Sequence, residues 1–319
     1  MISYRWSVGL FPTPTVAGSV AAVGTRRRLD AELVRRGLAP SRERAQAEIA
    51  AGRVTVGGAP APKASRLVDA SEAVELLGPP PRFVSRAGAK LEGAIVEFDL
   101  GDEFRDARVL DVGASTGGFT DCALQYGAKQ VIALDVGHNQ LHERLIADQR
   151  VRNIERTNIR AADLEIIGGP VGLVVGDLSF ISLRIVLEPM FALCQPGALF
   201  ILLVKPQFEA GRIEAARGRG IITDPEIWTR VLTEVTDAMV SLTAVIIGVM
   251  VSPITGSDGN VEFIVVGRSP GLINSSSLDH DALVESIGRS VAAAPRSGAF
   301  AQKPGQFSVA STVQPAEQG

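Results

Sequence analysis

Short apolar runs alternate with longer amphipathic segments through the central and C-terminal parts of the chain. The runs predict buried strands at residues 109–112, 129–134, 171–175 and 199–204. Helical spacing of apolar positions predicts helices at residues 91–98, 119–126, 138–146, 183–194 and 226–242. Two further runs, 245–251 and 261–266, predict a final pair of strands. This alternation indicates an α/β fold, a doubly wound parallel sheet with one antiparallel strand at the end.

The first predicted strand breaks at a glycine-rich turn. Residues 108–121 read RVLDVGASTGGFTD, which places Gly113, Ser115, Gly117 and Gly118 between the strand and the next helix. Such a turn is typical of nucleotide-binding βα units, because glycine lets the backbone approach a ligand closely. The alternative is a glycine-rich turn that binds nothing. Serine at 115 departs from the dinucleotide-binding pattern, which has its second glycine there.

Charged residues follow several predicted strands. Asp135 ends the second strand, about 20 residues after the turn, and is placed to accept hydrogen bonds from a ribose. Asp177 ends one later strand and Lys205 the next. Ligands of open α/β sheets sit beyond these strand ends, so we expect Asp177 and Lys205 to meet over one crevice. The alternative for each residue taken singly is a solvated strand end.

A small module precedes this domain. Residues 30–36 and 41–49 have helical patterns, and Ser41 is suited to cap the second helix. Residues 54–56 alternate like a strand before a Gly-Gly turn, and residues 73–77 are a possible partner strand. The pattern indicates an α+β module over residues 25–78, a stiff proline-rich linker over 79–84 and a larger domain over 85–275.

Charge is unevenly distributed. The whole chain has a formal net charge of −3, yet ten basic residues outnumber four acidic ones between residues 26 and 66. The basic residues are Arg26, Arg27, Arg28, Arg35, Arg36, Arg42, Arg44, Arg53, Lys63 and Arg66. A basic module in an acidic protein favours a polyanion as its partner. The alternative is a solvated basic helix face.

The two ends of the chain lack these patterns. For residues 1–24 we expect a disordered leader, or a start codon assigned upstream of the true one, rather than a signal peptide. Residues 276–319 are expected to be a terminal segment that becomes a disordered tail from residue 292, where Ala, Ser, Pro and Gln dominate. The longest apolar runs are too short to span a bilayer, which argues against a membrane partner.

The cysteine content is low. Cys122 and Cys194 are the two cysteines of the chain, too few for a disulfide framework and without metal-ligand spacing. We therefore expect a reducing cytoplasmic location and no bound metal. Separately, we expect a monomeric protein.

The small module resembles a known RNA-binding module. The similarity lies in Arg28-Leu29-Asp30, Gly37, Ser41-Arg42, Ile49 and the run Gly52-x-Val54-x-Val56-x-Gly58. Ribosomal small-subunit protein four, pseudouridine synthases and tyrosyl-tRNA synthetase share this module. The resemblance implies that the 41–49 helix faces RNA, with Arg42 and Arg44 on phosphates, which position a protein without reading sequence. We predict RNA contacts also for Arg28, Arg53 and Lys63.

Four segments of the larger domain resemble the TlyA family. They read SRAGAKL (85–91), DVGASTGGFTD (111–121), DLSFISL (177–183) and KPQFE (205–209). The resemblance implies an RNA-binding module joined to an FtsJ-like, S-adenosylmethionine-dependent ribose 2′-O-methyltransferase with a Rossmann-like class I fold. It further implies ribosomal RNA as the substrate, methylated at cytidine riboses in both ribosomal subunits. Members of the family have also been called haemolysins.

The resemblance also implies site residues. The family's catalytic Lys-Asp-Lys-Glu tetrad falls on Lys90, Asp177, Lys205 and Glu262, of which Glu262 follows a variable loop. The cofactor S-adenosylmethionine is expected on Gly113, Ser115, Gly117, Gly118 and Asp135, together with Asp111. Methyl transfer to a ribose hydroxyl depends on in-line positioning, and a basic group or a cation beside the hydroxyl assists it.

Residues 209–223 combine arginines with glycines. We expect this segment to be a mobile loop that closes on RNA, with contacts from Arg212 and Arg219 and with Arg217 between them. The alternative is a plain exposed loop.

Three other functions compete with an rRNA methyltransferase. A membrane-active haemolysin would need a secretory segment, an insertion helix or a spanning stretch, and the sequence has none of these patterns. A catalytically inactive RNA-binding assembly factor would not need the intact tetrad. A Rossmann dehydrogenase is disfavoured by Ser115 and by the lack of a histidine suited to hydride-transfer chemistry.

Overall fold

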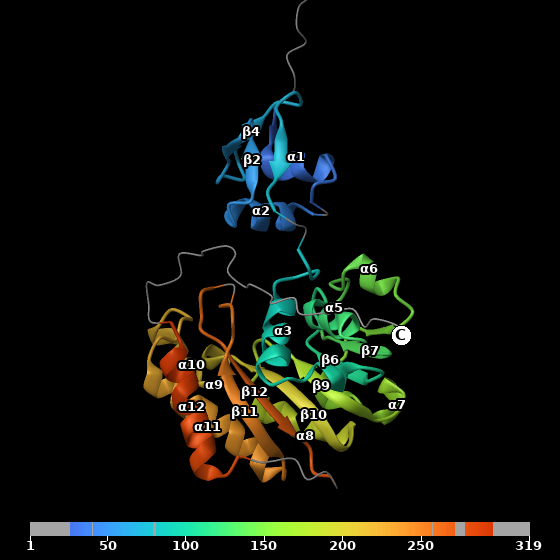
Figure 1. Cartoon of the computed structure of the whole chain (residues 1–319), viewed down its shortest axis with the longest axis vertical. Helices are drawn as coiled ribbons and strands as arrows, with labels where there is room; N and C mark the ends of the chain where they lie inside the picture. The colour runs from blue at the N-terminus through green and yellow to red at the C-terminus, as the bar shows by residue number, and fades with distance from the viewer. Residues whose placement is uncertain (1–25, 40, 79–80, 257, 272–277, 296–319) are drawn as a thin grey trace, which may run out of the picture. The chain divides into compact units, whose positions relative to one another are not determined.

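The computed structural model describes residues 26–39, 41–78, 81–256, 258–271 and 278–295 (Figure 1). The expected leader, Pro79 and Pro80 of the expected linker, and the tail beyond residue 295 lie outside the described residues. The chain divides into two compact units, which meet in sequence between Pro80 and Pro81.

The smaller unit packs two helices on short antiparallel strands. Its helices are α1 (Leu29–Arg35) and α2 (Arg42–Ala50), and the Ser41 Oγ caps α2 by accepting from the Arg44 backbone N at 3.2 Å. Strand β2 (Val54–Val56) lies between β3 (Ala59–Pro60) and β5 (Val74–Leu76), while β1 (Arg27–Arg28) pairs with β4 (Leu67–Val68). Leu29, Leu33, Ala45, Ile49 and Val54 lie in its core.

The larger unit is built on a seven-stranded sheet in the order β11-β12-β10-β9-β6-β7-β8. Its strands are β6 (Arg108–Val112), β7 (Gln130–Leu134), β8 (Val151–Ile154), β9 (Val171–Gly176), β10 (Cys194–Val204), β11 (Val245–Val251) and β12 (Phe263–Arg268). The prediction of a doubly wound sheet with one antiparallel strand is confirmed. That strand is β12, the last strand among the residues that the structure describes, which lies between β10 and β11 and runs antiparallel to both.

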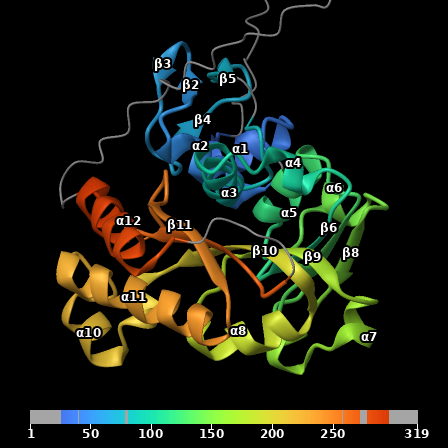
Figure 2. The same cartoon turned by 60° about the horizontal axis from the view of Figure 1, so that its bottom comes forward.

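Helices cover both faces of this sheet, as Figure 2 shows for α3 and α5 on one side and for α8 and α11 on the other. One face carries α3 (Ala87–Glu97), α4 (Gly101–Phe104), α5 (Gly118–Gln125) and α6 (Glu143–Ile146). The other carries α7 (Leu164–Ile167), α8 (Leu183–Ala192), α11 (Pro225–Ser241) and α12 (His280–Ala293). The remaining short helices are η1 (Ile159–Ala161), α9 (Pro206–Glu209) and α10 (Arg212–Arg217).

The strand order places one crevice at the centre of the sheet. From β6 the chain proceeds to β7 and β8 on one side, then crosses to β9 and β10 on the other. Val112 pairs with Gly176, so the ends of β6 and β9 are level at this reversal, which is where open α/β sheets bind ligands. Phe263 pairs with Val204, so the start of the antiparallel β12 lies beside the end of β10.

Several of the predicted segments are wrong in detail. The expected helix at 138–146 is helical only over Glu143–Ile146. Its first part is a loop because a side chain binds its backbone: Glu155 accepts from the Asn139 N–H, and just before the segment Asp135 accepts from the Gly137 N–H. The segment 209–223 contains helix α10 rather than loop alone. Val261 and Glu262 precede β12 instead of belonging to it.

The C-terminal segment also departs from expectation. The sequence predicts no ordered element after residue 276, yet α12 packs on β11 and α11. Leu283 and Ile287 of α12 are buried in the same core cluster as Trp228 and Val235 of α11. The expected disordered tail therefore cannot begin at residue 292, which lies inside the helix.

Candidate active site

The turn after β6 is tightly packed. Gly117 has φ = 95°, and a Cβ built on it would lie 2.2 Å from Cδ1 of Leu145. A Cβ on Gly118, the first residue of α5, would lie 2.2 Å from the Ser85 Oγ and 2.8 Å from the Gly88 N. These two glycines therefore let α5 approach the start of α3 and also α6 with the loop before it.

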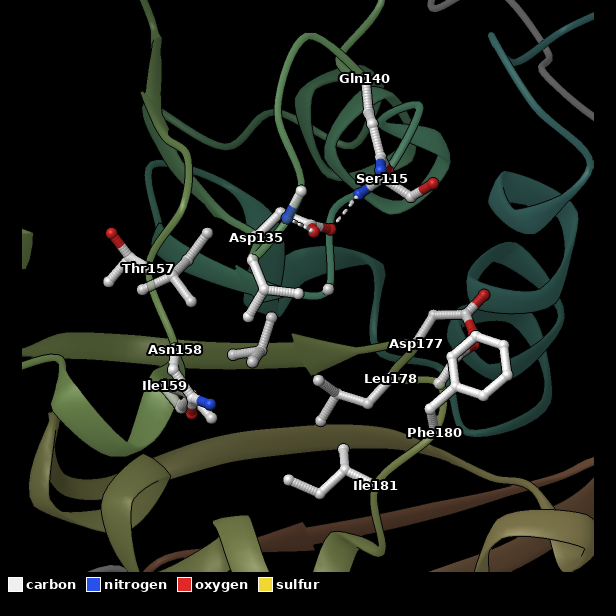
Figure 3. Close-up of a pocket in the computed structure, with 16 residues that line it drawn as sticks. Ser115, Asp135, Gln140, Thr157, Asn158, Ile159, Asp177, Leu178, Phe180 and Ile181 are labelled. Carbon is white, nitrogen blue, oxygen red and sulfur yellow. Dashed lines mark hydrogen bonds between the residues drawn. The ribbon is translucent and has the colours of Figure 1, made fainter.

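Asp135 extends from the end of β7 toward this turn. One carboxylate oxygen accepts a hydrogen bond from the Ser115 backbone N at 2.8 Å and the other from the Gly137 N at 2.7 Å (Figure 3). Each carboxylate oxygen has more than one acceptor position, so both can accept further bonds from a ligand. The two backbone donors fix the orientation of the carboxylate.

A cavity of about 580 Å³ opens beside Asp135. Figure 3 shows Thr157 and Asn158 at one side of it and Asp177, Leu178 and Phe180 at the other. The volume is in the range of small-molecule sites, and the walls combine apolar side chains with a few polar groups.

The predicted cofactor residues are placed differently around this space. Gly113, Ser115 and Asp135 line the cavity, and Gly113, Ser115 and Gly118 line a smaller adjoining cavity with Lys205. Gly117 lines neither and faces Leu141 and Leu145. Asp111 also lines neither, since it is fully buried in β6.

The environment of Asp111 is unusual. Its Oδ2 accepts a hydrogen bond from the Thr120 Oγ1 at 2.6 Å, while its buried Oδ1 has no hydrogen-bond partner. Burial raises the pKa of Asp111 from 3.8 to about 7, and the hydrogen bond from Thr120 opposes this rise. The group therefore holds a proton more readily than an ordinary carboxyl.

The structure brings Lys90, Asp177, Lys205 and Glu262 together at the level of the strand ends. The Nζ of Lys205 lies 2.6 Å from Oδ1 of Asp177. The Nζ of Lys90 lies 2.6 Å from Oε2 of Glu262 and 3.4 Å from Oδ2 of Asp177. The four side chains are 15% exposed or less, and they form a chain of alternating charges.

The fold explains this assembly. Asp177 follows β9 and Lys205 follows β10, two neighbouring parallel strands. Glu262 precedes β12, whose start is level with the end of β10 because β12 is antiparallel. Lys90 comes from the first turn of α3, which begins at Ala87 and thus four residues earlier than the sequence predicts. Burial raises the pKa of Glu262, and the charge of Lys90 opposes the rise.

Phe180 is a candidate that the sequence analysis does not single out. Phe180 is 90% exposed and its backbone has φ = 65°. It lies three residues after Asp177 in the sequence, and both residues line the cavity. Its ring lies 5.1 Å from the ring of Phe208, and the Lys205 ammonium lies 5.9 Å from the same Phe208 ring. A positive φ at an aromatic residue costs backbone strain, which is found at functional sites.

The arginine-bearing segment after Lys205 is anchored at both ends. Glu209, 4% exposed, accepts from the Ser182 Oγ at 2.5 Å and from the Leu183 N at 2.7 Å. The buried Asn260 accepts from the Ile222 N at 3.0 Å and donates to the Gly220 O at 2.8 Å. Between these anchors Arg212 begins α10 and Arg219 follows it, exposed and with φ = 52°.

The predicted RNA-binding residues of the smaller unit lie at its surface. Arg28, Arg42 and Arg53 are between 40% and 58% exposed in their side chains, and Arg44 is 20% exposed. Lys63 is exposed as well. All four arginines also contact a buried carboxylate of the same unit.

Comparison with known families agrees with this geometry. Residues 83–269 match the model of the FtsJ-like methyltransferases, and residues 27–74 match the S4 domain. The chain belongs to the FtsJ-like methyltransferase family. It therefore joins an S4 domain to a methyltransferase domain, and the fold and family predictions are confirmed.

Relatives of this FtsJ-like methyltransferase extend over both units. The Bacillus subtilis protein named "Putative rRNA methyltransferase YqxC" is 44% identical over 77% of this chain and 87% of its own. The 16S/23S rRNA (cytidine-2′-O)-methyltransferase TlyA of Mycobacterium tuberculosis is 41% identical over 85% of this chain and 99% of its own. A solved structure from Streptococcus thermophilus described as a hemolysin is 37% identical, covers 84% of this chain and 96% of that one, and has a TM-score of 0.64.

The helices bear on the haemolysin alternative. Among the residues that the structure describes, no helix of this FtsJ-like methyltransferase combines the length and the apolar character that crossing a membrane requires.

Proposed function

We propose that this protein transfers a methyl group from S-adenosylmethionine to the ribose 2′-hydroxyl of a cytidine in ribosomal RNA. The observation that carries the proposal is the buried Lys90–Asp177–Lys205–Glu262 cluster beside the cavity at the β6–β9 reversal. The M. tuberculosis relative, named for 2′-O-methylation of cytidine in 16S and 23S rRNA, supports the nucleoside and the substrate. A cytoplasmic location follows, because ribosomal subunits are there.

The cavity suits S-adenosylmethionine on its own chemistry. Asp135 presents a carboxylate, oriented by two backbone donors, to ribose hydroxyls. The glycine-rich turn leaves space beside it, and the smaller adjoining cavity leads from Ser115 to Lys205, where transfer would take place. When bound, this cofactor supplies an electrophilic methyl group on a sulfonium. Its position between Asp135 and the tetrad would direct the methyl toward the lysines.

Within the tetrad, Lys205 is the residue best placed to act on the hydroxyl. Its ammonium contacts Asp177 at 2.6 Å and donates to the Ser179 Oγ at 2.8 Å, so its position is fixed from two sides. We therefore assign Lys205 the role of a fixed cation that orients the hydroxyl and stabilises the developing alkoxide. The hydroxyl proton leaves late, to water. Lys90, paired with Glu262, holds Asp177 in place.

The pH dependence of the reaction tests this role of Lys205. In single-turnover methylation, Lys205→Arg should retain little activity at any pH, because a guanidinium places its charge differently. A wild-type rate that rises through an apparent pKa near neutrality, with that step absent in Lys205→Arg, would identify a neutral lysine base and contradict the cation role.

Phe180 adds support for an RNA substrate. Its exposed ring beside Asp177 offers a flat apolar surface, and aromatic rings stack on bases that are splayed out of RNA.

The proposed function is tested by comparing ribosomal RNA from cells with and without the gene. Reverse transcription at low nucleotide concentration should show a ribose-methylation stop that disappears on deletion and returns with the wild-type gene, but not with Lys205→Ala.

A further inference from the structure

Two of the three buried carboxylates of the smaller unit pair with the arginines that we predict to contact RNA. Asp30, in the first turn of α1, is fully buried, and the Glu48 side chain on α2 is 4% exposed. Burial of a charged carboxylate is costly unless ion pairs and hydrogen bonds offset it. Each of these carboxylates is paired with two arginines. The four arginines are Arg28, Arg42, Arg44 and Arg53.

Asp30 joins β1, α1 and α2 through five hydrogen bonds. Its Oδ1 accepts from the Arg28 Nε at 3.1 Å and from the Ala31 N at 2.9 Å. Its Oδ2 accepts from the Arg28 Nη2 at 2.9 Å, the Arg42 Nη2 at 3.1 Å and the Gln46 Nε2 at 2.8 Å. The hydrogen bond from Arg28 is the main reason why the pKa of Asp30 lies far below its ordinary value. Asp30 therefore stays charged and holds both guanidinium groups.

Glu48 does the same for the second pair. Its Oε1 lies 2.8 Å from the Arg44 Nε, one turn earlier on α2. Its Oε2 accepts from the Arg53 Nε at 2.6 Å, just beyond the end of α2. Both arginines therefore direct their Nε atom at the carboxylate.

These contacts leave part of each guanidinium available. A guanidinium has five N–H donors, and Arg42 uses one nitrogen, Nη2, on Asp30. The Arg42 side chain is 58% exposed and the Arg28 side chain 46%. The remaining donors can therefore meet phosphate oxygens while the inner edge stays on the carboxylate.

We propose that Asp30 and Glu48 are positioning residues that hold these two arginine pairs in the conformation that binds RNA phosphates. The inference rests on the proposed RNA-binding role of the S4 domain. A free arginine loses much rotamer freedom when it binds, and a carboxylate that fixes the side chain beforehand removes that cost from the binding step. The two acids lower the positive charge of the surface and yet strengthen its binding. When either acid is neutralised, the positive charge of the surface should therefore increase while its affinity for RNA decreases.

The experiment measures binding of the full-length protein to purified 30S and 50S ribosomal subunits over a series of KCl concentrations. Asp30→Asn and Glu48→Gln each add one positive charge and keep the shape of the side chain. Each should weaken binding about 5- to 50-fold, the loss expected when two arginines must be ordered during binding. The salt slope should stay close to that of the wild type, because all the arginines remain able to reach phosphates.

The matched control is Glu75→Gln. Glu75 on β5 is exposed and forms no ion pair with any residue that the structure describes, so its replacement adds the same charge without releasing an arginine. It should leave affinity unchanged or slightly higher. If Asp30→Asn and Glu48→Gln bind as tightly as Glu75→Gln, surface charge alone accounts for affinity and the inference is overturned.

Two further variants distinguish a failure of this inference from a failure of the RNA-binding role on which it rests. Arg42→Ala and Arg44→Ala should weaken binding and each reduce the salt slope by about one. If they do not, the RNA-binding role itself fails; if they do while the acid variants bind normally, only the positioning role fails. Thermal unfolding checks the fold of each variant. If one acid variant unfolds the domain, binding by the other acid variant tests the inference. If both variants unfold the domain, the two acids serve folding and the inference is wrong.

Discussion

At the scale of single residues, Asp135 binds its own loop with both carboxylate oxygens and still faces the cavity. We predict that Asp135→Ala weakens S-adenosylmethionine binding by about 1–3 kcal/mol, the scale of a lost hydrogen bond to a charged group. Asp135→Asn is the control for size, since it keeps the side-chain volume and one acceptor oxygen but loses the charge and the second acceptor. Titration calorimetry showing unchanged affinity in a folded Asp135→Ala protein would remove Asp135 from the cofactor site.

From the raised pKa of Asp111 we predict that the stability of the folded protein depends on pH. Its pKa is about 7 in the folded protein and ordinarily 3.8, so the folded state binds more protons between these values. Its contribution to stability is therefore complete below about pH 4 and is lost as the pH rises to about 7. Compared with Asp111→Asn, the ligand-free wild type should lose on the order of 1–4 kcal/mol of unfolding free energy across this range. Urea unfolding at pH 4 and pH 7 would refute the prediction if the difference between the two proteins stayed constant.

At the scale of elements, the contact between α3 and α5 sets the position of Lys90. A Cβ on Gly118 would meet the Ser85 Oγ at 2.2 Å and the Ala87 Cβ at 2.8 Å, so Gly118→Ala should push the start of α3 away from the turn. We predict destabilisation of about 1–3 kcal/mol, as for other overpacked sites, together with a large loss of methylation. Gly288→Ala on α12 is the control, because an added Cβ there would meet no atom within 4 Å and helix propensity favours alanine. Equal activity in the two variants would contradict a role for this contact.

Strands were the most predictable elements. Central parallel strands such as β9 and β10 are buried on both faces, so they appear as continuous apolar runs in the sequence. The loop before α6 was not predictable from periodicity, since distant side chains such as Glu155 bind its backbone. Helix α12 was missed because its few buried apolar residues, Leu283 and Ile287, stand among polar ones.

The candidate site was partly predictable. The sequence pattern predicts that Asp177 and Lys205 follow neighbouring strands and meet in one crevice. In the structure the Lys205 Nζ lies 2.6 Å from the Asp177 Oδ1. Glu262 came from family resemblance, because its position depends on the antiparallel pairing of β12, which periodicity does not reveal. Phe180 was missed, since neither its exposure nor its positive φ leaves a mark in the sequence.

At the scale of the whole molecule, the two units carry different functional groups. The larger unit holds the cavity and the tetrad, and the smaller carries the arginine pairs. Deletion of residues 26–77 should therefore leave cofactor binding within about twofold and abolish methylation of ribosomal subunits, because phosphate contacts supply much of the affinity for RNA. Calorimetry and methyl incorporation on the same preparation measure both. A truncated protein that methylates subunits at the full rate would contradict this division.

In the proposed reaction, the tetrad directs a methyl group to a ribose hydroxyl of ribosomal RNA. The most direct test incubates purified 30S and 50S subunits with the protein and isotopically labelled S-adenosylmethionine, then analyses the nucleosides by mass spectrometry. We predict labelled 2′-O-methylcytidine with the wild type, and at least about a hundredfold less with Lys205→Ala at unchanged cofactor affinity, the scale of a lost group that stabilises developing charge. Label on a base, or undiminished product with Lys205→Ala, would contradict it.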